Sequence, residues 1–335
     1  NESRRNVPMS ADFLTDSQVQ NYGRYAAEPN EVQLARYFHL DERDLDFVNH
    51  RRGRHNRLGI ALQLTTARFL GTFINDAMQI PAGVRHYVAA QLGIPRPEIL
   101  SRYAQRENTR WEHHALIRQH YGYHDFGDQP WSFRLKRLLY VRAWLSNERP
   151  GLMFDFATAW LLQHKVLLPA ASTLTRIIGE IRERANRRLW RKLASLPDSW
   201  QTAQLAGLLE IPEGQRMSVM EQLRKGPVTV SGPSFTEALE RYTRLRNLEF
   251  SRLNFSGLPA IQLRNLARYA GMASARYIAR MPEARRLAVL TAFVKAQEIA
   301  ALDEAVDVLD MLILDIAREA KKTGQKKRLR TLKDL

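Results

Sequence analysis

Cysteine is absent from the 335 residues of this chain, and long apolar runs are absent as well. Without cysteine the chain has no disulfide bond, no thiolate nucleophile and no cysteine-based zinc site. No run approaches the ~20 apolar residues that a membrane-spanning helix needs, and the N-terminus lacks the apolar core of a signal peptide. We therefore expect a cytoplasmic protein with no membrane partner.

Signals for β-strands are also scarce. Only Val228, Thr229 and Val230, between two Gly-Pro pairs, form a β-like run, which is too short to found a sheet. Elsewhere apolar residues recur at spacings of three and four, which is typical of amphipathic helices. The sequence predicts an all-α fold of several small helical, helix-turn-helix-like modules joined by linkers. Helices are expected at 31–38, 41–49, 56–70, 81–92, 96–104, 107–121, 131–146, 152–164, 170–195, 234–250, 259–270 and 283–322, the last as one helix or two.

Acidic residues are outnumbered, because 51 Lys and Arg face 35 Asp and Glu, which gives a formal net charge of +16 at pH 7. A folded chain tolerates such self-repulsion most easily when a polyanion neutralises it, so nucleic acid is the expected partner. Arginine, whose planar fork grips phosphate and guanine edges bidentately, is far commoner than lysine. The alternative is a basic coat that serves solubility, with its charges scattered.

Glycine and proline clusters divide the chain into segments. Residues 1–9 are expected to be a lead-in or a cloning remnant. A first helical DNA-binding domain is expected at 10–127, and a second one, with a helix-turn-helix-like layout, at 128–200. Residues 201–233 are expected to be a linker, and 234–335 a third helical domain for DNA binding or assembly.

The first basic cluster lies in Arg51-Arg-Gly-Arg-His-Asn-Arg-Leu-Gly59, at a tight turn that leads into a helix. A helix start presents free backbone N–H groups and the positive end of the helix dipole, which favour phosphate. We expect anion binding here, with a solvated loop as the alternative. The candidate DNA-binding residues are Arg51, Arg52, Arg54, Asn56 and Arg57.

A second cluster follows at three- and four-residue spacing, and it forms one stripe if the helix is continuous. Such a stripe can lie along a DNA backbone. It can equally pair with Glu107 and Glu112 and serve only to keep the helix soluble. The candidate residues are Arg106, Arg110 and His113.

The third cluster has a recognisable layout. A helix at 152–164, a short break at 165–169 and a second helix from Ala170 form a helix-turn-helix, whose second helix lies in the major groove. The second helix has an apolar stripe of Leu174, Ile177, Ile178, Ile181, Ala185 and Leu189. Its arginines fall largely off that stripe, which favours DNA contact over a bundle with a basic outer face. These candidates are Arg176, Arg182, Arg184, Arg187, Arg188 and Arg191.

Two catalytic interpretations fail. The acidic residues Asp303, Asp307 and Asp310 suggest two-metal chemistry. An apolar stripe runs through the same helix, so we interpret these acids as its solvated face. Four histidines suggest a metal site, but cysteine and suitably spaced carboxylates are missing. We therefore expect ordinary helix-surface histidines at His113, His114, His120 and His124. No phosphate-cradling glycine loop occurs.

Four motifs in order resemble the N-terminal region of the Tn-three family of replicative transposases (TnpA type). The first is Arg51-Arg-Gly-x-x-Asn-Arg-Leu-Gly59, and the second is Tyr103-x-x-Arg106-Glu-x-Thr109-Arg110-x-Glu-His113. The third runs from Leu168-Pro169-Ala170 to Ala185-Asn-Arg-Arg188, and the fourth is Pro282-Glu-x-Arg285-Arg286. The resemblance covers essentially the whole chain.

The resemblance implies that this chain recognises terminal inverted repeats in double-stranded DNA, in the bacterial cytoplasm and on the nucleoid when bound. It implies that catalysis belongs to an RNase H-like domain with Asp, Asp and Glu ligands outside this chain. The chain itself is then no enzyme and needs no cofactor, and Mg²⁺ is expected only for the missing domain. Helices of the third segment are expected to help assemble paired ends, with possible self-association of the full-length protein.

Two other functions stay open. One is a helical assembly scaffold whose basic faces bind acidic protein or RNA, since helices carry little sign of the polymer they touch. Single-stranded RNA recognition often uses stacking aromatics on an exposed sheet, which this sequence does not predict. The other is a stand-alone nuclease, which predicts metal-dependent cleavage by the chain itself.

Overall fold

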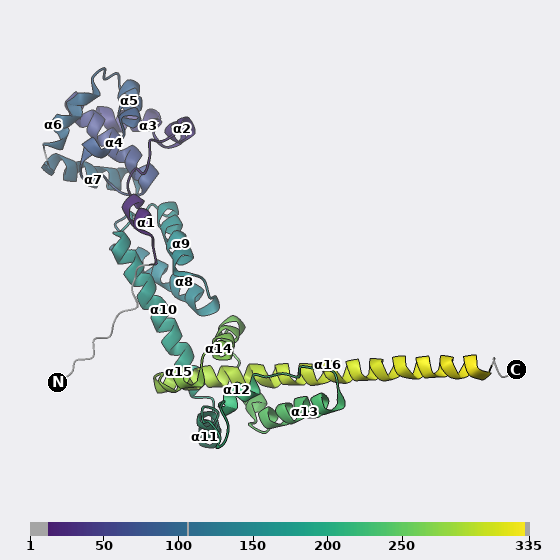
Figure 1. The fold of residues 1–335 in the computed structure, drawn as a ribbon. Helices are drawn as coiled ribbons and strands as arrows, with labels where there is room; N and C mark the ends of the chain where they lie inside the picture. The colour runs from purple at the N-terminus through teal and green to yellow at the C-terminus, as the bar shows by residue number, and fades with distance from the viewer. Residues whose placement is uncertain (1–12, 106, 332–335) are drawn as a thin grey trace. The chain divides into compact units, whose positions relative to one another are not determined.

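The computed structural model describes residues 13–105 and 107–331, so the expected lead-in at 1–9 and Arg106 lie outside the described residues (Figure 1). Within this part all regular structure is helical, and an isolated bridge between His124 and Val166 is the only strand-like pairing. The prediction of an all-α fold is confirmed. No helix among the described residues combines the length and apolar character needed to cross a bilayer.

The chain forms two compact units. The first unit comprises the residues up to Ala143 together with Glu148–Arg182. The second unit comprises Trp144–Asn147 together with the residues from Glu183 onward. The helices of the first unit are α1 (Asp16–Asn21), α2 (Glu31–Tyr37), α3 (Glu42–Asn49), α4 (Arg54–Leu70), α5 (Ala82–Gln91), α6 (Leu100–Ala104), α7 (Glu107–Tyr121), α8 (Trp131–Leu145), α9 (Pro150–Gln163) and the first half of α10 (Ala171–Ala194).

Helix α4 is the centre of the first core, because every residue from Leu58 to Ala67 is buried. A helical stretch that is buried all round needs neighbours on all sides, and α2, α3, α5, α6 and α7 contact it. Gly59 gives α6 its close approach to α4, since a Cβ there would lie 2.5 Å from the ring of Tyr103. The helix ends at Gly71, whose φ of 72° is the left-handed conformation that glycine adopts readily.

A second core in the first unit joins α8, α9 and α10 through Leu135, Leu139, Leu161, Leu174 and Ile178, all fully buried. The turn between α9 and α10 is tied down by backbone hydrogen bonds. The N–H of His124 donates to the Lys165 carbonyl at 2.9 Å, and the N–H of Leu168 donates to the Gly71 carbonyl at 2.9 Å. The helix-turn-helix therefore lies against the first core rather than on a free linker.

The second unit is built on one long helix. Its helices are the second half of α10, α11 (Ser199–Gly207), α12 (Val219–Leu223), α13 (Gly232–Arg246), α14 (Ala260–Met272), α15 (Ala275–Ala279) and α16 (Glu283–Thr331). Helices α13 and α14 pack along α16, as Figure 1 shows. No glycine or proline interrupts the stretch from 283 to 323, so the alternative of two helices is wrong.

Two expectations for the middle of the chain differ from the structure. The segment 201–233, expected to be a linker, holds α11 and α12 and adds four apolar side chains to the core of the second unit: Leu205, Leu208, Met220 and Leu223. The segment 128–200, expected to be one domain, is divided between the units within α10, after Arg182. The physical reason is that each half of α10 buries its apolar stripe in a different core.

A buried arginine links three helices of the second unit. The Arg241 side chain on α13 is only 9% exposed, and its Nε donates to the Leu223 carbonyl of α12 at 2.8 Å. Its guanidinium also donates to Gln297 Oε1 at 2.8 Å and pairs with the Glu304 carboxylate, both on α16. A buried charge needs this full set of partners, so the contact defines how α12 and α13 sit on α16.

Candidate nucleic-acid interface

The turn before α4 presents exposed arginines at a helix N-terminus. Gly53 is the N-cap with a φ of 86°, no side chain caps the helix, and its first turn holds no acidic residue. Arg52 and Arg54 flank this glycine and are exposed. The N–H groups at the start of this 17-residue helix and the helix dipole add to the same positive potential. This end of α4 suits a phosphate group.

The other three residues of this cluster brace the turn. The guanidinium carbon of Arg51 lies 5.4 Å from the centre of the Phe47 ring, and Asn56 Nδ2 donates to the Arg52 carbonyl at 2.9 Å. Arg57 Nη1 is 3.4 Å from Asn49 Oδ1. Within the described structure, three buried atoms here have no hydrogen-bond partner: Arg51 Nε, Asn56 Oδ1 and Arg57 Nε. Buried polar atoms are seldom left without partners, so the cluster has spare hydrogen-bonding capacity.

The second cluster does not form a surface stripe. Arg106 lies outside the described residues, and the Arg110 side chain is only 16% exposed. Arg110 Nη1 donates to the Asn75 carbonyl, and its Nη2 lies 3.4 Å from Glu107. Arg110 therefore holds the segment after α4 in place.

His113 lies in the core and is 4% exposed, with its Nδ1 3.2 Å from the Tyr103 hydroxyl. Burial, reinforced by Arg51, lowers the pKa of His113 to about 4. His114 is also buried, stacks on Phe73 at 4.1 Å, and has its pKa lowered to about 4 by burial and by Arg110. The prediction that these two are surface histidines is wrong, because His113 packs on Tyr103 of α6 and His114 packs on Phe73.

His120 is exposed and His124 is partly exposed. Across residues 13–105 and 107–331, no group of three or more His, Cys, Asp or Glu side chains is arranged to hold a metal ion. The acidic cluster on α16 has the character expected of it, since Asp303, Asp307 and Asp310 are exposed. Its interpretation as the solvated face of a helix is confirmed.

Helix α10 has the apolar stripe that the sequence predicts. All six stripe residues are buried, and the layout of helix, turn and helix over α9 and α10 is confirmed. In the first unit, Arg176 is exposed and pairs with Glu180 at 2.7 Å. Arg182 is half-buried, and burial lowers the pKa of its guanidinium. The first half of α10 thus offers one exposed arginine and one partly sheltered arginine.

The second half of α10 carries four exposed arginines. Arg187 lies 3.4 Å from Glu183, and Arg191 Nε donates to the Arg187 carbonyl at 3.3 Å. The guanidinium of Arg188 lies 4.9 Å from the centre of a Trp144 ring, and Arg184, four residues earlier, is also exposed. Exposed ion pairs contribute only ~0–1 kcal/mol, so a phosphate can displace Glu183 at little cost. This basic face lies opposite the buried stripe.

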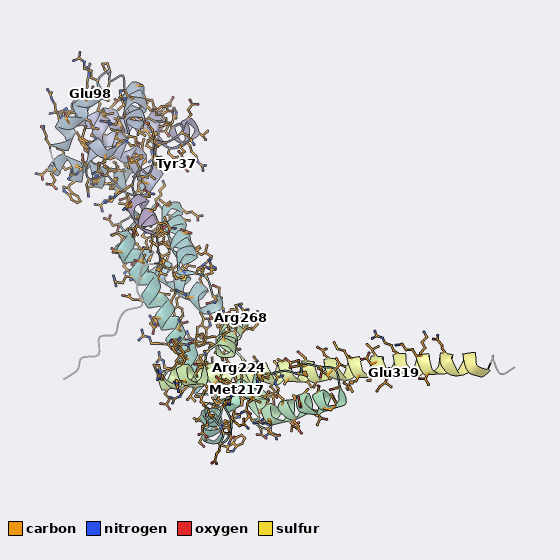
Figure 2. The ribbon with its side chains drawn as sticks, in the orientation of Figure 1. Tyr37, Glu98, Met217, Arg224, Arg268 and Glu319 are labelled. Atoms are coloured by element: carbon orange, nitrogen blue, oxygen red, sulfur yellow. The ribbon has the colours of Figure 1, made fainter. Side chains whose placement is uncertain are left out.

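One basic surface was missed by the sequence reasoning. The segment 250–282 holds no Asp or Glu, and it displays exposed arginines on α14 and α15, of which Figure 2 labels Arg268. Tyr269 and Tyr277 join the two helices through a side-chain hydrogen bond. The absence of Asp and Glu from this segment was the sequence signal that could have identified the surface. The residues are Arg264, Arg268, Arg276 and Arg280.

The fold and these faces define an all-α protein with arginine-rich helical surfaces. The chain belongs to the family described as a domain of unknown function (DUF4158), whose model matches residues 13–181. It is 79% identical to the transposase for transposon gamma-delta of Escherichia coli (strain K12), over 98% of this chain and 33% of that protein.

More distant relatives have similar names. The chain is 27% identical to the transposase for transposon Tn1546 of Enterococcus faecium over 95% of its length, and 27% identical to the transposase for transposon Tn501 of Pseudomonas aeruginosa over 90%. These relatives bear out the resemblance to transposases. The chain spans about a third of the length of the relatives it matches.

Proposed function

We propose that this chain binds double-stranded DNA at the terminal inverted repeats of a transposon, as the N-terminal part of a transposase. The observation that carries the proposal is the exposed basic face of α10, which lies opposite a buried apolar stripe in a helix-turn-helix layout. The relatives are transposases, which must act on DNA ends. The proposed setting is the bacterial cytoplasm, on the nucleoid.

The proposed mechanism divides the arginines by task. Arg52 and Arg54 neutralise phosphates at the start of α4, which positions the protein without reading sequence. Side chains of α10, above all Arg187 and Arg188, read base edges in the major groove. Linked modules follow a long repeat because each further contact is intramolecular and occurs at high effective concentration.

We propose that strand cleavage and its Mg²⁺ ions belong to the remaining two thirds of the full-length protein. On this proposal the chain is no enzyme and holds no cofactor of its own. We also propose that the full-length protein self-associates, since transposition joins two ends of one element. Both proposals extend from the names and the lengths of the relatives.

The deciding experiment is a footprint of this chain on the ends of a candidate element, with a shuffled duplex as the control. We expect protection of the repeat and weak, uniform binding of the shuffled DNA. Competition with structured RNA separates duplex recognition from the scaffold alternative. Equal displacement by RNA and by repeat duplex would count against the proposal.

A further inference from the structure

Gly179 stands in the middle of α10, where nothing in the protein requires a glycine. It is the ninth residue of a 24-residue helix, and its backbone is helical. A Cβ built at this position meets no atom within 4 Å. Glycine inside a helix lowers stability relative to alanine, because it loses more conformational entropy on folding. The first unit therefore contains a destabilising glycine that its own packing does not explain.

The other helical glycines of the first unit have a visible reason. Gly59 lies against the ring of Tyr103. Gly83 donates its N–H to the Glu28 carboxylate, which leaves no room for a Cβ. Gly151 is the second residue of α9, at a helix end. Among the described residues of this unit, only Gly179 is a mid-helix glycine with open space around it.

Gly179 belongs to an exposed face of α10 that is called here the α10 crest and comprises Ser172, Arg176 and Gly179. With 3.6 residues per turn, these three positions fall within about 60° of one another around the helix axis. The centre of the crest lies about 180° from the centre of the buried positions in the same half of the helix. Those buried positions are Leu174, Ile177, Ile178 and Ile181.

The polar surroundings of Gly179 favour nucleic acid over a second protein helix as the partner. Helices that pack in water bury apolar side chains against each other, whereas Ser172, Arg176 and Glu180 surround this glycine. Arg176 pairs with Glu180 at 2.7 Å, and both side chains are more than 60% exposed. Such an exposed ion pair is weak, so another acceptor can take over the guanidinium. Guanine offers two acceptors, O6 and N7, in the major groove.

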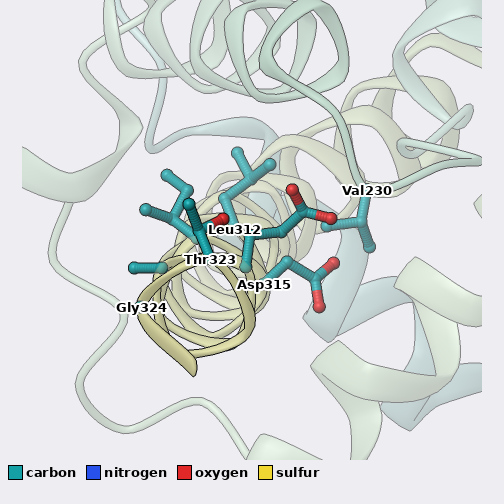
Figure 3. Close-up of a pocket in the computed structure, with 8 residues that line it drawn as sticks. Val230, Leu312, Asp315, Thr323 and Gly324 are labelled. Atoms are coloured by element: carbon teal, nitrogen blue, oxygen red, sulfur yellow. The ribbon is translucent and has the colours of Figure 1, made fainter. Parts of the chain in front are cut away.

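The hollow on α16 that Figure 3 shows is a poor alternative for DNA. Its lining includes the carboxylates of Asp315 and Glu319. These charges repel phosphate groups, which line both sides of every groove in a duplex. Base edges lie at the floor of a groove, so they are reached by an exposed helix rather than by a recess. The α10 crest has that form, in a helix-turn-helix layout.

The dimensions of α10 and of the major groove explain the use of a glycine on the crest. A helix with its side chains is about 10–12 Å across, and the major groove is about 12 Å wide and 8.5 Å deep. The side chain at the centre of the inserted face therefore sets how deeply the helix rests. A glycine there lets the backbone approach the base edges, and any larger residue holds it away.

We infer that Gly179 is the point at which α10 comes closest to the base pairs of duplex DNA, and that Arg176 and Ser172 read the neighbouring bases. Seven residues at 1.5 Å, or roughly 10 Å, separate Ser172 from Gly179. This length matches about three base pairs at 3.4 Å. Guanine is the expected partner of Arg176. The inference rests on the proposed duplex binding, to which it adds a specificity-determining site in the first unit.

Gly179→Ala and Gly179→Leu test the inference, because stability and recognition should change in opposite directions. Alanine and leucine favour a helix over glycine, so both variants should have a higher melting temperature. Binding to the repeat should fall about tenfold with alanine and roughly a hundredfold with leucine, since the added atoms keep Arg176 and Ser172 from the bases. Binding to random duplex should hardly change, because phosphate contacts dominate it.

Gly151→Leu is the matched control. It adds the same side chain to the same unit, at a position where a Cβ also meets nothing within 4 Å. This variant should bind repeat and random duplex as the unchanged chain does. Arg176→Lys tests the neighbouring contact, because lysine keeps the charge but cannot bind guanine through a planar fork. It should weaken the preference for one base pair and leave random binding unchanged.

Base-pair substitutions across the repeat locate the contact. Affinities measured with the unchanged chain and with Gly179→Ala give a double-mutant cycle for each base pair. The coupling should be confined to about three adjacent base pairs. The base pair that couples to Arg176→Lys should belong to the same group.

Four results would contradict the inference in distinguishable ways. An unchanged chain that binds repeat and random duplex equally removes the proposed function, and the inference with it. A preference for the repeat that survives Gly179→Leu leaves the proposed function standing and removes only the role of the crest. Equal losses on both duplexes, or coupling spread over the whole repeat, would place the crest away from base edges. A lower melting temperature in Gly179→Ala would show that the fold itself requires the glycine.

Discussion

Gly59 on α4 lies directly against the ring of Tyr103 on α6, so closely that an added Cβ would come within 2.5 Å of the ring carbons. Tyr103 is 1% exposed and cannot swing away. The glycine therefore positions α6, whose approach to α4 completes the first core. Gly59 belongs to the first basic motif of the sequence, where its role is packing rather than contact with an anion.

Gly59→Ala is expected to destabilise the first unit by about 1–3 kcal/mol, because overpacking forces side chains and backbone to shift. Gly179→Ala is the matched control, since nothing lies within 4 Å of a Cβ at that helical position. The control is expected to stabilise α10 by about 0.5–1 kcal/mol. Thermal and urea unfolding of both variants checks the pair. Equal effects on the two would refute the packing role of Gly59.

Stability is expected to fall as the pH is lowered from about 6.5 to about 4, because His113 and His114 are buried in the neutral form. Burial lowers the pKa of each to about 4, below the ordinary value of 6.5. The unfolded chain then binds protons that the folded chain excludes, so the stabilisation is complete above pH 6.5 and is lost through this window. By the lower end of this window each histidine has reduced the free energy of unfolding by roughly 2–3 kcal/mol.

His114→Phe is the variant that tests this dependence, because a phenyl ring keeps the stacking on Phe73 at 4.1 Å. It should flatten the fall in melting temperature between pH 6.5 and pH 4. Burial raises the pKa of Asp44, but hydrogen bonds from Arg68 and Tyr121 outweigh this effect and lower it. Protonation of Asp44 should therefore still destabilise the protein below this window. An unchanged slope in His114→Phe would exclude the histidine as its source.

Local periodicity predicted α4 and α10 well, because each buries an apolar face that repeats with the period of a helix. It failed for α11 and α12, although the capping pair of Asp198 and Gln201 marks the start of α11, because nearby Gly and Pro residues suggested a linker. The sequence could not predict the burial of His113, because that burial depends on Tyr103 of another helix. Which side chains face one another across a core is a tertiary property, and residue spacing in the sequence does not determine it.

Arg52→Ala combined with Arg54→Ala should reduce the salt dependence of duplex binding. Each phosphate contact contributes about 0.9 to the slope of log affinity against log salt concentration, so the double variant should lower its magnitude by up to about two. Gel shifts from 50 to 200 mM salt on the repeat duplex measure this. The loss should be similar on random duplex, because phosphates carry no sequence information.

Arg24→Ala with Arg36→Ala is the charge-matched control for that experiment. Both side chains are exposed in the same unit, near the other end of α4, where Tyr25 binds Thr66 and Tyr37 packs on Phe69. This variant should leave the slope nearly unchanged. If both variants lower it equally, the turn before α4 acts only through net charge and is not a site.

Arg187→Ala combined with Arg188→Ala should weaken binding to the repeat more than binding to random duplex. Each good bidentate contact to a base discriminates by about 1–3 kcal/mol, and both side chains lie on the exposed face of α10. Arg216→Ala with Arg244→Ala removes the same charge from exposed positions elsewhere in the second unit. That control should weaken both duplexes slightly and to the same extent. Equal losses on repeat and random DNA in the α10 variant would mean that these arginines hold the backbone, and base reading would then have to be sought on another helix.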